Sequence, residues 1–405
     1  MTKIRVLVFL LTLFVIITAG TVAALYARGF RFNTKDMRLS SNGLMVLKSV
    51  PDSAQVYING ELKTATNTTL SLQPGTYDVD IKKAGFKSWY KRLVVDKEVV
   101  TEATAQLFKS VPSLSPFTFS ETQEPTPSWD FNKIAYIVPP NTGSDNQIDG
   151  SGLWVIEMVN LPLGFSREPK KVTDGNLQGA TWIWSPDGRE ILLTTKVGTY
   201  LLNVGTFTSQ AQRTNIAATK DTITKSWDQK RQTKKASQLK KLPDRMQEVL
   251  VRRTSSYDFS PDEDMVLYTA SSAATIEDGL IKPIPGSSTQ KQERNIKPSH
   301  TYVYDIKEDR NFLIDADASN LVIEGGKVSS AQKRISWFPT SRNLIIAEPS
   351  KITICDYDGT NHQEVYSGSY VSPYAFPMLS QDGLIILTNL GASSNPANLY
   401  SLTLR

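Results

Sequence analysis

The feature that most constrains this fold is a repeat in the C-terminal part of the chain. Five segments share one pattern: an aromatic or aliphatic residue ends a strand, a tight turn follows, and an aliphatic strand runs back. The pattern is clearest in Trp184-Ser185-Pro186-Asp187-Gly188, where the last four residues all favour turns. The copies begin at Ser128, Trp184, Phe259, Trp337 and Leu379. A second hairpin follows most copies, and four-stranded units at roughly 40–50 residues are typical of a β-propeller.

The Trp-Ser-Pro-Asp-Gly copy resembles the WD40-like (PD40) repeats of TolB-type propellers. The resemblance covers residues 112–405 and is closest in the second and third copies. It implies a mainly β fold with five blades, a degenerate sixth being left open, and a rigid face of loops. The last blade ends early at Arg405, so we expect residues 114–120 to supply its missing strand and close the ring.

Two insertions interrupt the repeat. Residues 271–299 are rich in Ser, Gly, Pro and Gln and predict a long surface loop. Residues 218–253 predict helix, with Ser226 and Gln229 as a capping box and Pro243 opening a second, shorter helix. Apolar residues at helical spacing should pack on the blades. They are Leu239, Leu242, Met246, Val249 and Leu250.

The helical insertion also carries the positive charge of the chain. It holds eleven basic and four acidic residues, whereas the whole chain has a net charge of only +5. Its densest run comprises Lys230, Arg231, Lys234, Lys235, Lys240 and Lys241. We expect these six residues to form a solvated helix face; the alternative is that they contact an anionic partner, such as envelope polymer, lipid headgroups or an acidic protein. Because the repeat continues on both sides, a short Gly-Ser link should replace the insertion without unfolding the propeller.

The N-terminus predicts a membrane segment. Residues 6–27 contain no charge, and these 22 residues would span roughly 33 Å as a helix, enough for a hydrocarbon core of about 30 Å. We predict a cytoplasmic tail at 1–5 and an uncleaved signal anchor at 6–27; the alternative is a signal peptide cleaved near Thr21-Val22-Ala23. Basic residues flank both sides of the segment, so charge alone does not set its orientation. They include Lys3, Arg5, Arg28, Arg31, Lys35 and Arg38.

After a linker at 28–42, residues 43–109 predict a small all-β sandwich. Short apolar runs at 44–47, 55–58, 77–81, 87–95 and 99–107 alternate with turn residues. Asn59-Gly60 is the strongest hairpin signal among them. The segment resembles the PEGA domain family of bacterial surface proteins, although Asp52-Ser53 stands where that family has Glu-Gly. The matching positions are Ser49, Pro51, Ala54, Gly60, Leu72, Pro74, Gly75, Tyr77, Val79, Gly85 and Phe86. The resemblance implies an extracytoplasmic, non-catalytic module near the cell envelope.

Composition and motifs argue against most catalytic sites. A single cysteine, Cys355, and two histidines, His300 and His362, leave no multi-thiolate zinc site and few possible triads. No nucleophile elbow, phosphate-binding glycine loop or dinucleotide fingerprint is present. Two weak calcium candidates, the run 356–361 and the group Asp145, Asn146 and Asp149, fit ordinary hairpin and loop chemistry better. We therefore expect no catalytic residue, no metal and no cofactor.

Taken together, these patterns predict a single-pass bacterial membrane protein with its C-terminal domains outside the cytoplasm. Its expected role is non-catalytic binding or scaffolding of envelope polymer or envelope proteins, with neither nucleic acid nor a small-molecule substrate as ligand. Two alternatives stay open. One is a propeller enzyme acting on envelope polysaccharide, which would need paired carboxylates at the blade mouths. The other is a periplasmic partner of a transport complex, by analogy with TolB.

Overall fold

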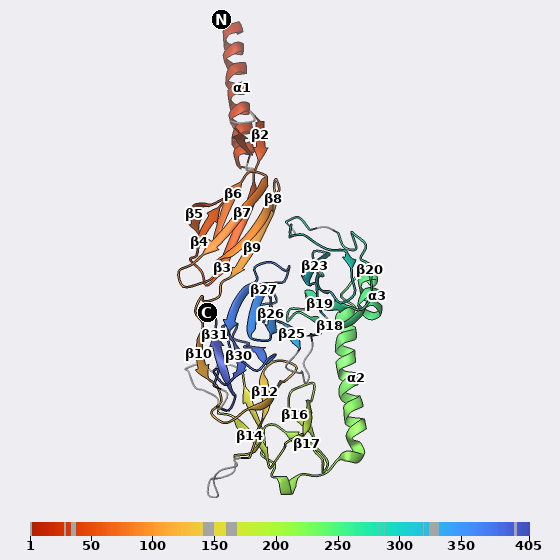
Figure 1. The fold of residues 1–405 in the computed structure, drawn as a ribbon. Helices are drawn as coiled ribbons and strands as arrows, with labels where there is room; N and C mark the ends of the chain where they lie inside the picture. The colour runs from red at the N-terminus through yellow and green to blue at the C-terminus, as the bar shows by residue number, and fades with distance from the viewer. Residues whose placement is uncertain are drawn as a thin grey trace. The chain divides into compact units, whose positions relative to one another are not determined.

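A computed structural model describes residues 2–27, 30–33, 38–140, 150–158, 168–282, 284–286, 288–318, 320–323, 332–392 and 395–405. The chain forms two compact units (Figure 1). The first comprises Met1–Leu107 with Pro283–Gln290, and the second comprises Phe108–Lys282 with Lys291–Arg405. Each unit is described here by itself.

The first unit begins with the apolar helix α1, Thr2–Ala27. Within it, Ile4–Ala24 has a mean hydropathy of 2.7, and none of it is buried against the rest of the chain. The hydroxyls of Thr12, Thr18 and Thr21 each donate to the carbonyl four residues earlier at 2.6–2.8 Å, so these polar groups need no water. Length and composition suit a membrane span, although a signal sequence near an N-terminus has the same properties.

The expected linker at 28–42 contains regular structure. Strands β1, Phe30–Asn33, and β2, Arg38–Ser41, pair antiparallel as a two-stranded ribbon. This pairing was not predicted, because each strand has only four residues and the sequence lacks a recognised hairpin turn.

The sandwich consists of two sheets, with strand orders β6-β3-β9 and β5-β4-β7-β8. The strands are β3 Gly43–Val50, β4 Gln55–Ile58, β5 Glu61–Ala65, β6 Thr68–Leu72, β7 Gly75–Lys82, β8 Trp89–Val95 and β9 Val100–Gln106. The five predicted strands are confirmed. β5 was missed because its largely exposed residues give no apolar alternation, and β6 because only Leu70 and Leu72 carry its alternation. β3 pairs in parallel with β9, a long-range pairing that local sequence does not encode.

The hairpin predicted at Asn59-Gly60 is also confirmed. Both residues have positive φ, 51° and 84°, as a type I′ turn requires. The side-chain Oδ1 of Asn59 accepts a hydrogen bond from the backbone N–H of Asp78 on the neighbouring strand, at 2.9 Å. The asparagine therefore shapes the turn and also fastens it to β7.

The second unit is a mainly β propeller, as predicted. Its larger sheets, numbered here in chain order, have strand orders β11-β12-β13-β14, β15-β16-β17, β18-β19-β22-β23, β24-β25-β26-β27-β28 and β29-β30-β31-β10 within the described residues. All pairs in them are antiparallel except β24 with β25.

The bounds of the strands in the first three sheets are β11 Gln123–Pro127, β12 Lys133–Val138, β13 Gly152–Glu157, β14 Lys170–Asp174, β15 Thr181–Trp184, β16 Glu190–Thr194, β17 Thr199–Asn203, β18 Thr254–Phe259, β19 Met265–Ala270, β22 Thr301–Asp305 and β23 Arg310–Asp315. Those in the last two are β24 Leu321–Val322, β25 Lys333–Trp337, β26 Asn343–Glu348, β27 Lys351–Asp356, β28 Gln363–Ser367, β29 Ala375–Pro377, β30 Gly383–Thr388, β31 Asn398–Thr403 and β10 Ser113–Pro116.

The ring closes as expected, through the start of the unit. β10 pairs antiparallel with β31, the last strand of the chain, with Leu114 opposite Leu402. Just beyond β10, the buried hydroxyl of Thr118 accepts a hydrogen bond from the backbone N–H of Leu399 at 2.9 Å. The N-terminal strand of the propeller therefore completes its final sheet.

Apolar clusters join neighbouring sheets around the ring. Separate clusters connect the first sheet with the second, the first with the fifth, the fourth with the fifth, and the third with the fourth. Among the described residues, no such cluster connects the second sheet with the third. The helical insertion lies in the chain at this point, between β17 and β18.

The insertion consists of two short 3₁₀ turns, η2 Gln210–Gln212 and η3 Ala217–Thr219, and two α-helices. The helices are α2 Lys220–Leu239 and α3 Asp244–Arg253. Figure 1 shows α2 as a long green helix that begins near β17 and ends near β18. The capping box at Ser226 and Gln229 was wrong: Thr219 is the N-cap, and Ser226 lies within the helix. The 3₁₀ turn feeds directly into α2, so the helix begins before the predicted cap.

The predicted packing of this insertion on the blades is confirmed. Leu242, Met246 and Leu250 are at least 96% buried, in one cluster with apolar residues of the third sheet such as Val266. This packing argues against the expectation that a Gly-Ser link could replace the insertion, because removing α3 would expose the core of the third sheet to water.

The second insertion, at 271–299, is more ordered than the expected surface loop. Its ends pair as β20, Ala274–Thr275, and β21, Asn295–Ile296. Ile276 and Ile296 are buried in the cluster of the third sheet. The Ser/Gly/Pro composition correctly indicated a turn-rich segment, but two isolated isoleucines gave no signal of burial.

Candidate functional site

A cavity of about 450 Å³ lies where the five repeat turns of the propeller converge. Each turn contributes at least one lining residue, represented by Trp129, Pro186, Pro261, Trp337 and Leu379. Helix α2 contributes the rest of the wall with Lys230, Arg231, Lys234, Lys235 and Gln238. We call this cavity the axial mouth. Its size lies within the range of ligand pockets, about 300–1,000 Å³.

The turns around the axial mouth share one hydrogen-bonding pattern. In the first three copies a serine hydroxyl donates to the aspartate two residues later at 2.6 Å, from Ser128, Ser185 and Ser260. The same hydroxyl accepts the backbone N–H five residues on, at 2.9–3.0 Å. The fourth copy lacks this serine, because Phe338 occupies its place. The Ser-x-Asp pairs therefore shape the turns from which the cavity is built.

These bonds also determine the charge of the aspartates. The hydrogen bond from Ser185 holds the pKa of Asp187 below its usual range. For Asp130, burial acts to raise the pKa, but hydrogen bonds from Ser128 and Asn132 outweigh it, so the pKa is lowered. Asp130 lines the axial mouth as an anion whose oxygens are already engaged by neighbouring donors.

Tryptophans at the ends of strands β15 and β25 connect neighbouring sheets. The indole N–H of Trp184 donates to the carbonyl of Thr126 at 3.1 Å, and that of Trp337 donates to the carbonyl of Asp258 at 3.3 Å. The first bond joins the second sheet to the first, and the second joins the fourth sheet to the third. We call the five repeat turns that line the axial mouth its rim. Each of the two hydrogen bonds ties a rim turn to the neighbouring sheet, so the protein itself supports the shape of the rim.

Helix α2 is attached to the rim by polar and aromatic contacts. The Arg231 guanidinium lies over the ring of Trp129, 5.2 Å from its centroid, and the Lys235 ammonium lies 5.2 Å from that of Tyr257. Gln238 donates to Glu263 at 3.0 Å, and Lys241 forms an ion pair with the same carboxylate. The Lys241 hydrogen bond, followed by that of Gln238, holds the pKa of Glu263 below its usual range.

The structure separates the six candidate contact residues. Lys230, Arg231, Lys234 and Lys235 line the axial mouth, so the sequence located one wall of this site. Lys241 does not line the cavity but is paired with Glu263, which does, and Lys240 is exposed at the C-cap of α2. The rim itself was missed as a site, because its aromatic residues were interpreted only as strand ends. The available signal was the recurrence of an aromatic or aliphatic residue beside the turns.

The weaker candidates have structural roles where they are described. Asp356 accepts hydrogen bonds from Asn343 and Asn361, each at 3.0 Å, and Asp358 accepts one from the hydroxyl of Thr360 at 2.6 Å, as expected for a hairpin. The described residues contain no group of three or more side chains that could hold a metal ion. Asp145, Asn146 and Asp149 lie outside the described residues.

Within the described residues, the cysteine is buried and the two histidines contact structural neighbours. Cys355 is fully buried on β27, and burial raises the pKa of its thiol. His300 lies 2.9 Å from the carbonyl of Pro298 and stacks on Tyr302, with 6.2 Å between ring centroids. The Nε2 atom of His362 lies 3.2 Å from the carbonyl oxygen of Gly359, its hydrogen-bond partner within the described residues. A histidine–nucleophile pair is therefore absent from the described residues.

Comparison with known proteins gives one family match. Residues 42–110 match the PEGA domain, which confirms the resemblance of this segment. Comparison with curated protein sequences gives no match.

Among solved structures, a putative TolB from Agrobacterium tumefaciens is similar at 12% identity and a TM-score of 0.23, over 71% of this chain and 84% of that one. TolB from Acinetobacter baumannii is similar at 13% identity and a TM-score of 0.19, over 81% and 60%. A quinonprotein alcohol dehydrogenase-like protein from Bacteroides thetaiotaomicron is similar at 9% identity and a TM-score of 0.19, over 89% and 95%. The propeller assignment rests on the order of the sheets and on the pairing of β10 with β31.

Proposed function

We propose that this protein is a membrane-anchored, non-catalytic binding protein of the cell envelope that holds a partner at the axial mouth. The observation that carries the proposal is the cavity itself. Five turns and one helix converge on it, and the rim keeps large apolar side chains exposed, with Trp129 46% and Leu379 37% accessible. Exposed apolar groups in a preformed concave site are typical of a binding surface.

The N-terminal part of the chain supports the location. Helix α1 is long and apolar enough to act as a signal anchor, and the PEGA resemblance implies an extracytoplasmic module. In this proposal α1 holds the protein in the cell membrane and both folded units lie outside the cytoplasm. A partner at the axial mouth is then an envelope component rather than a cytosolic one.

The enzymatic alternative is less well supported by the site. A glycosidase needs two carboxyl groups free to exchange protons and to face the substrate. In the axial mouth, Asp130 accepts hydrogen bonds from Ser128 and Asn132, and Glu263 accepts them from Gln238 and Lys241. Both carboxylates have lowered pKa values, which suits anions with structural roles better than a general acid.

Site-specific photo-crosslinking in cells tests this proposal. A photo-activatable phenylalanine analogue in place of Leu379 lies on the rim, whereas the same analogue in place of Val197 lies on an exposed hairpin, with 83% of Val197 accessible. We expect a discrete crosslinked partner from position 379 and not from position 197. The absence of any adduct at 379, or the same adduct at both positions, would contradict binding at the axial mouth.

A further inference from the structure

We propose, resting on the function proposed above, that the axial mouth receives an extended acidic peptide segment of a partner protein, with one apolar anchor residue. Two features of the lining lead to this ligand. One wall offers lysines that form no ion pair among the described residues, and the turns offer apolar side chains that remain partly exposed.

The free positive charge belongs to two lysines of α2. Lys230 and Lys234 both line the cavity, and they are four residues apart, so they lie on the same side of the helix. Both are exposed, and within the described residues neither has an ion-pair partner. Arg231 differs from them, because it is paired with Asp228 and stacked on Trp129.

The negative charges of the lining do not cancel this pair. Asp130 is engaged by Ser128 and Asn132, and Glu263 by Gln238 and Lys241. The third lining carboxylate, Asp258, also has a contact within the chain. An incoming carboxylate therefore meets two lysines that form no ion pair among the described residues, whereas an incoming cation meets carboxylates that already have partners. Electrostatic complementarity of this kind favours an acidic partner over a neutral or basic one.

The apolar side chains of the rim indicate that the ligand also has an apolar group. Trp129 and Leu379 remain partly exposed, and prolines of three turns and of strand β29 line the same cavity. A cavity of about 450 Å³ admits a few side chains but not a folded domain. Partly exposed aromatic rings and prolines can hold an extended segment through its side chains.

A peptide fits this combination better than an anionic polymer or a lipid headgroup. Recognition of phosphate usually employs the planar fork of arginine, and the Arg231 fork is already occupied by Asp228 and Trp129. The ammonium group of lysine is a compact charge that can donate to a carboxylate from many directions. An acidic segment with one aromatic or aliphatic residue uses both the lysines and the apolar side chains of the lining.

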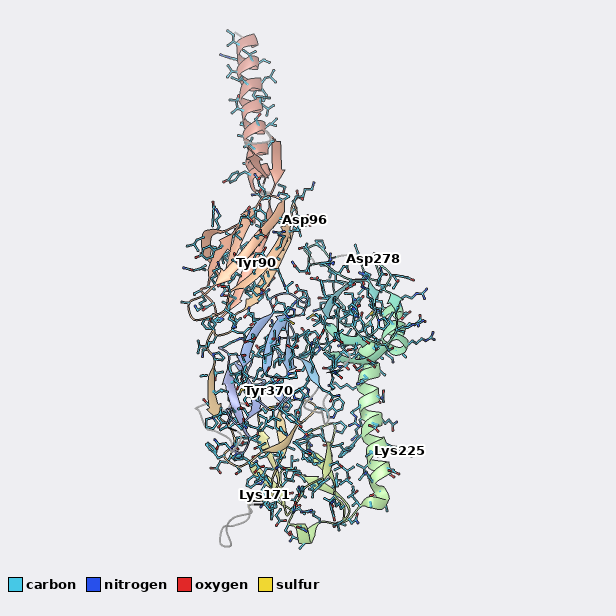
Figure 2. The ribbon with its side chains drawn as sticks, viewed as in Figure 1. Tyr90, Asp96, Lys171, Lys225, Asp278 and Tyr370 are labelled. Atoms are coloured by element: carbon cyan, nitrogen blue, oxygen red, sulfur yellow. The ribbon has the colours of Figure 1, made fainter. Side chains whose placement is uncertain are left out.

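The test is selection from a random twelve-residue peptide display library on the detergent-solubilised full-length protein. We expect the enriched peptides to contain more Asp and Glu than Lys and Arg, together with one large apolar residue. Their affinity should fall about tenfold or more in a Lys230→Glu, Lys234→Glu variant, equivalent to about 1.4 kcal/mol or more, and should fall as salt is raised. A matched control, Lys225→Glu with Lys240→Glu, changes the same charge at exposed α2 positions outside the lining and should bind as wild type. Figure 2 marks Lys225 on α2.

Several outcomes would overturn the inference. These are enrichment of neutral or basic peptides, no enrichment, or equal binding to wild type and the Lys230/Lys234 variant. Phosphatidylglycerol vesicles or an anionic polysaccharide that compete as well as the peptides, and lose binding in the same variant, would also overturn it. If crosslinking from position 379 succeeds while any of these occurs, the binding function stands and only the peptide ligand is wrong. If that crosslinking fails, the proposed function itself is wrong.

Discussion

At the scale of single residues, Glu263 connects the propeller to helix α2, which forms one wall of the axial mouth. It lies in the third repeat turn and accepts hydrogen bonds from Gln238 and Lys241 of the helical insertion. Its side chain is 30% accessible, so water screens the ion pair and its contribution to stability is small, about 0.2–1 kcal/mol. The contribution should nevertheless depend on pH in a defined direction.

We predict that Glu263→Gln lowers the stability of the propeller at neutral pH by about 0.2–1 kcal/mol and that the difference disappears in acid. The folded pKa is lowered, so the unfolded chain binds a proton first as pH falls from above about 4.5. The stabilisation is therefore present above the unfolded pKa and is lost as pH falls through the folded one. Denaturant unfolding followed by tryptophan fluorescence at neutral and acidic pH measures it.

Glu364→Gln is the control for this experiment, because Glu364 is an exposed carboxylate on β28 without an ion pair among the described residues. It should change stability little at either pH. A Glu263→Gln variant that is equally destabilised at both pH values would show that the carboxylate charge does not hold α2 to the turn.

At the scale of elements, the insertion divides into two helices with different roles. α2 has only Trp227 buried and faces the axial mouth, whereas α3 buries Met246, Val249 and Leu250 against the third sheet. α3 is thus part of the core of the propeller, whereas α2 contributes the basic side chains that line the axial mouth. Changes in the two helices should separate stability from binding.

We predict that Met246→Ala destabilises the propeller by about 2–5 kcal/mol, because it leaves a cavity beneath a helix that cannot collapse fully onto the sheet. Met246 is completely buried, whereas Val251 on the same helix is 64% exposed. Val251→Ala should therefore change stability by no more than about 0.5 kcal/mol. Thermal unfolding of the two variants measures the difference, and equal losses would mean that α3 does not pack as described.

At the scale of the whole molecule, the proposed anchoring by α1 would hold both folded units at the membrane. The helix has no polar face, and the described chain buries none of its membrane-capable segment. We predict that full-length protein stays in the membrane fraction after a carbonate wash. Leu10→Arg with Phe14→Arg should release it, because each arginine costs about 2.5–3.5 kcal/mol near the centre of a membrane helix. Recovery of a soluble form that begins near Ala24 would contradict the signal anchor and favour cleavage.

The sequence by itself determined the features that depend on a few neighbouring residues. The turn at Asn59-Gly60, the Ser-x-Asp turns of the repeat and the apolar run of α1 all follow from local backbone preference or local composition. The spacing of Leu242, Met246 and Leu250 likewise predicted which face of the insertion is buried. Local patterns of this kind are formed by interactions that span at most a few turns of the chain.

Only the tertiary structure decided which of these elements meet. The parallel pairing of β3 with β9 joins strands about fifty residues apart, and the axial mouth brings together residues between 129 and 381. The sequence marked Lys230 and Lys241 as members of one basic run, but folding left Lys230 at the cavity and paired Lys241 with Glu263. Such choices depend on burial and charge pairing summed over distant segments, which no short window of sequence contains.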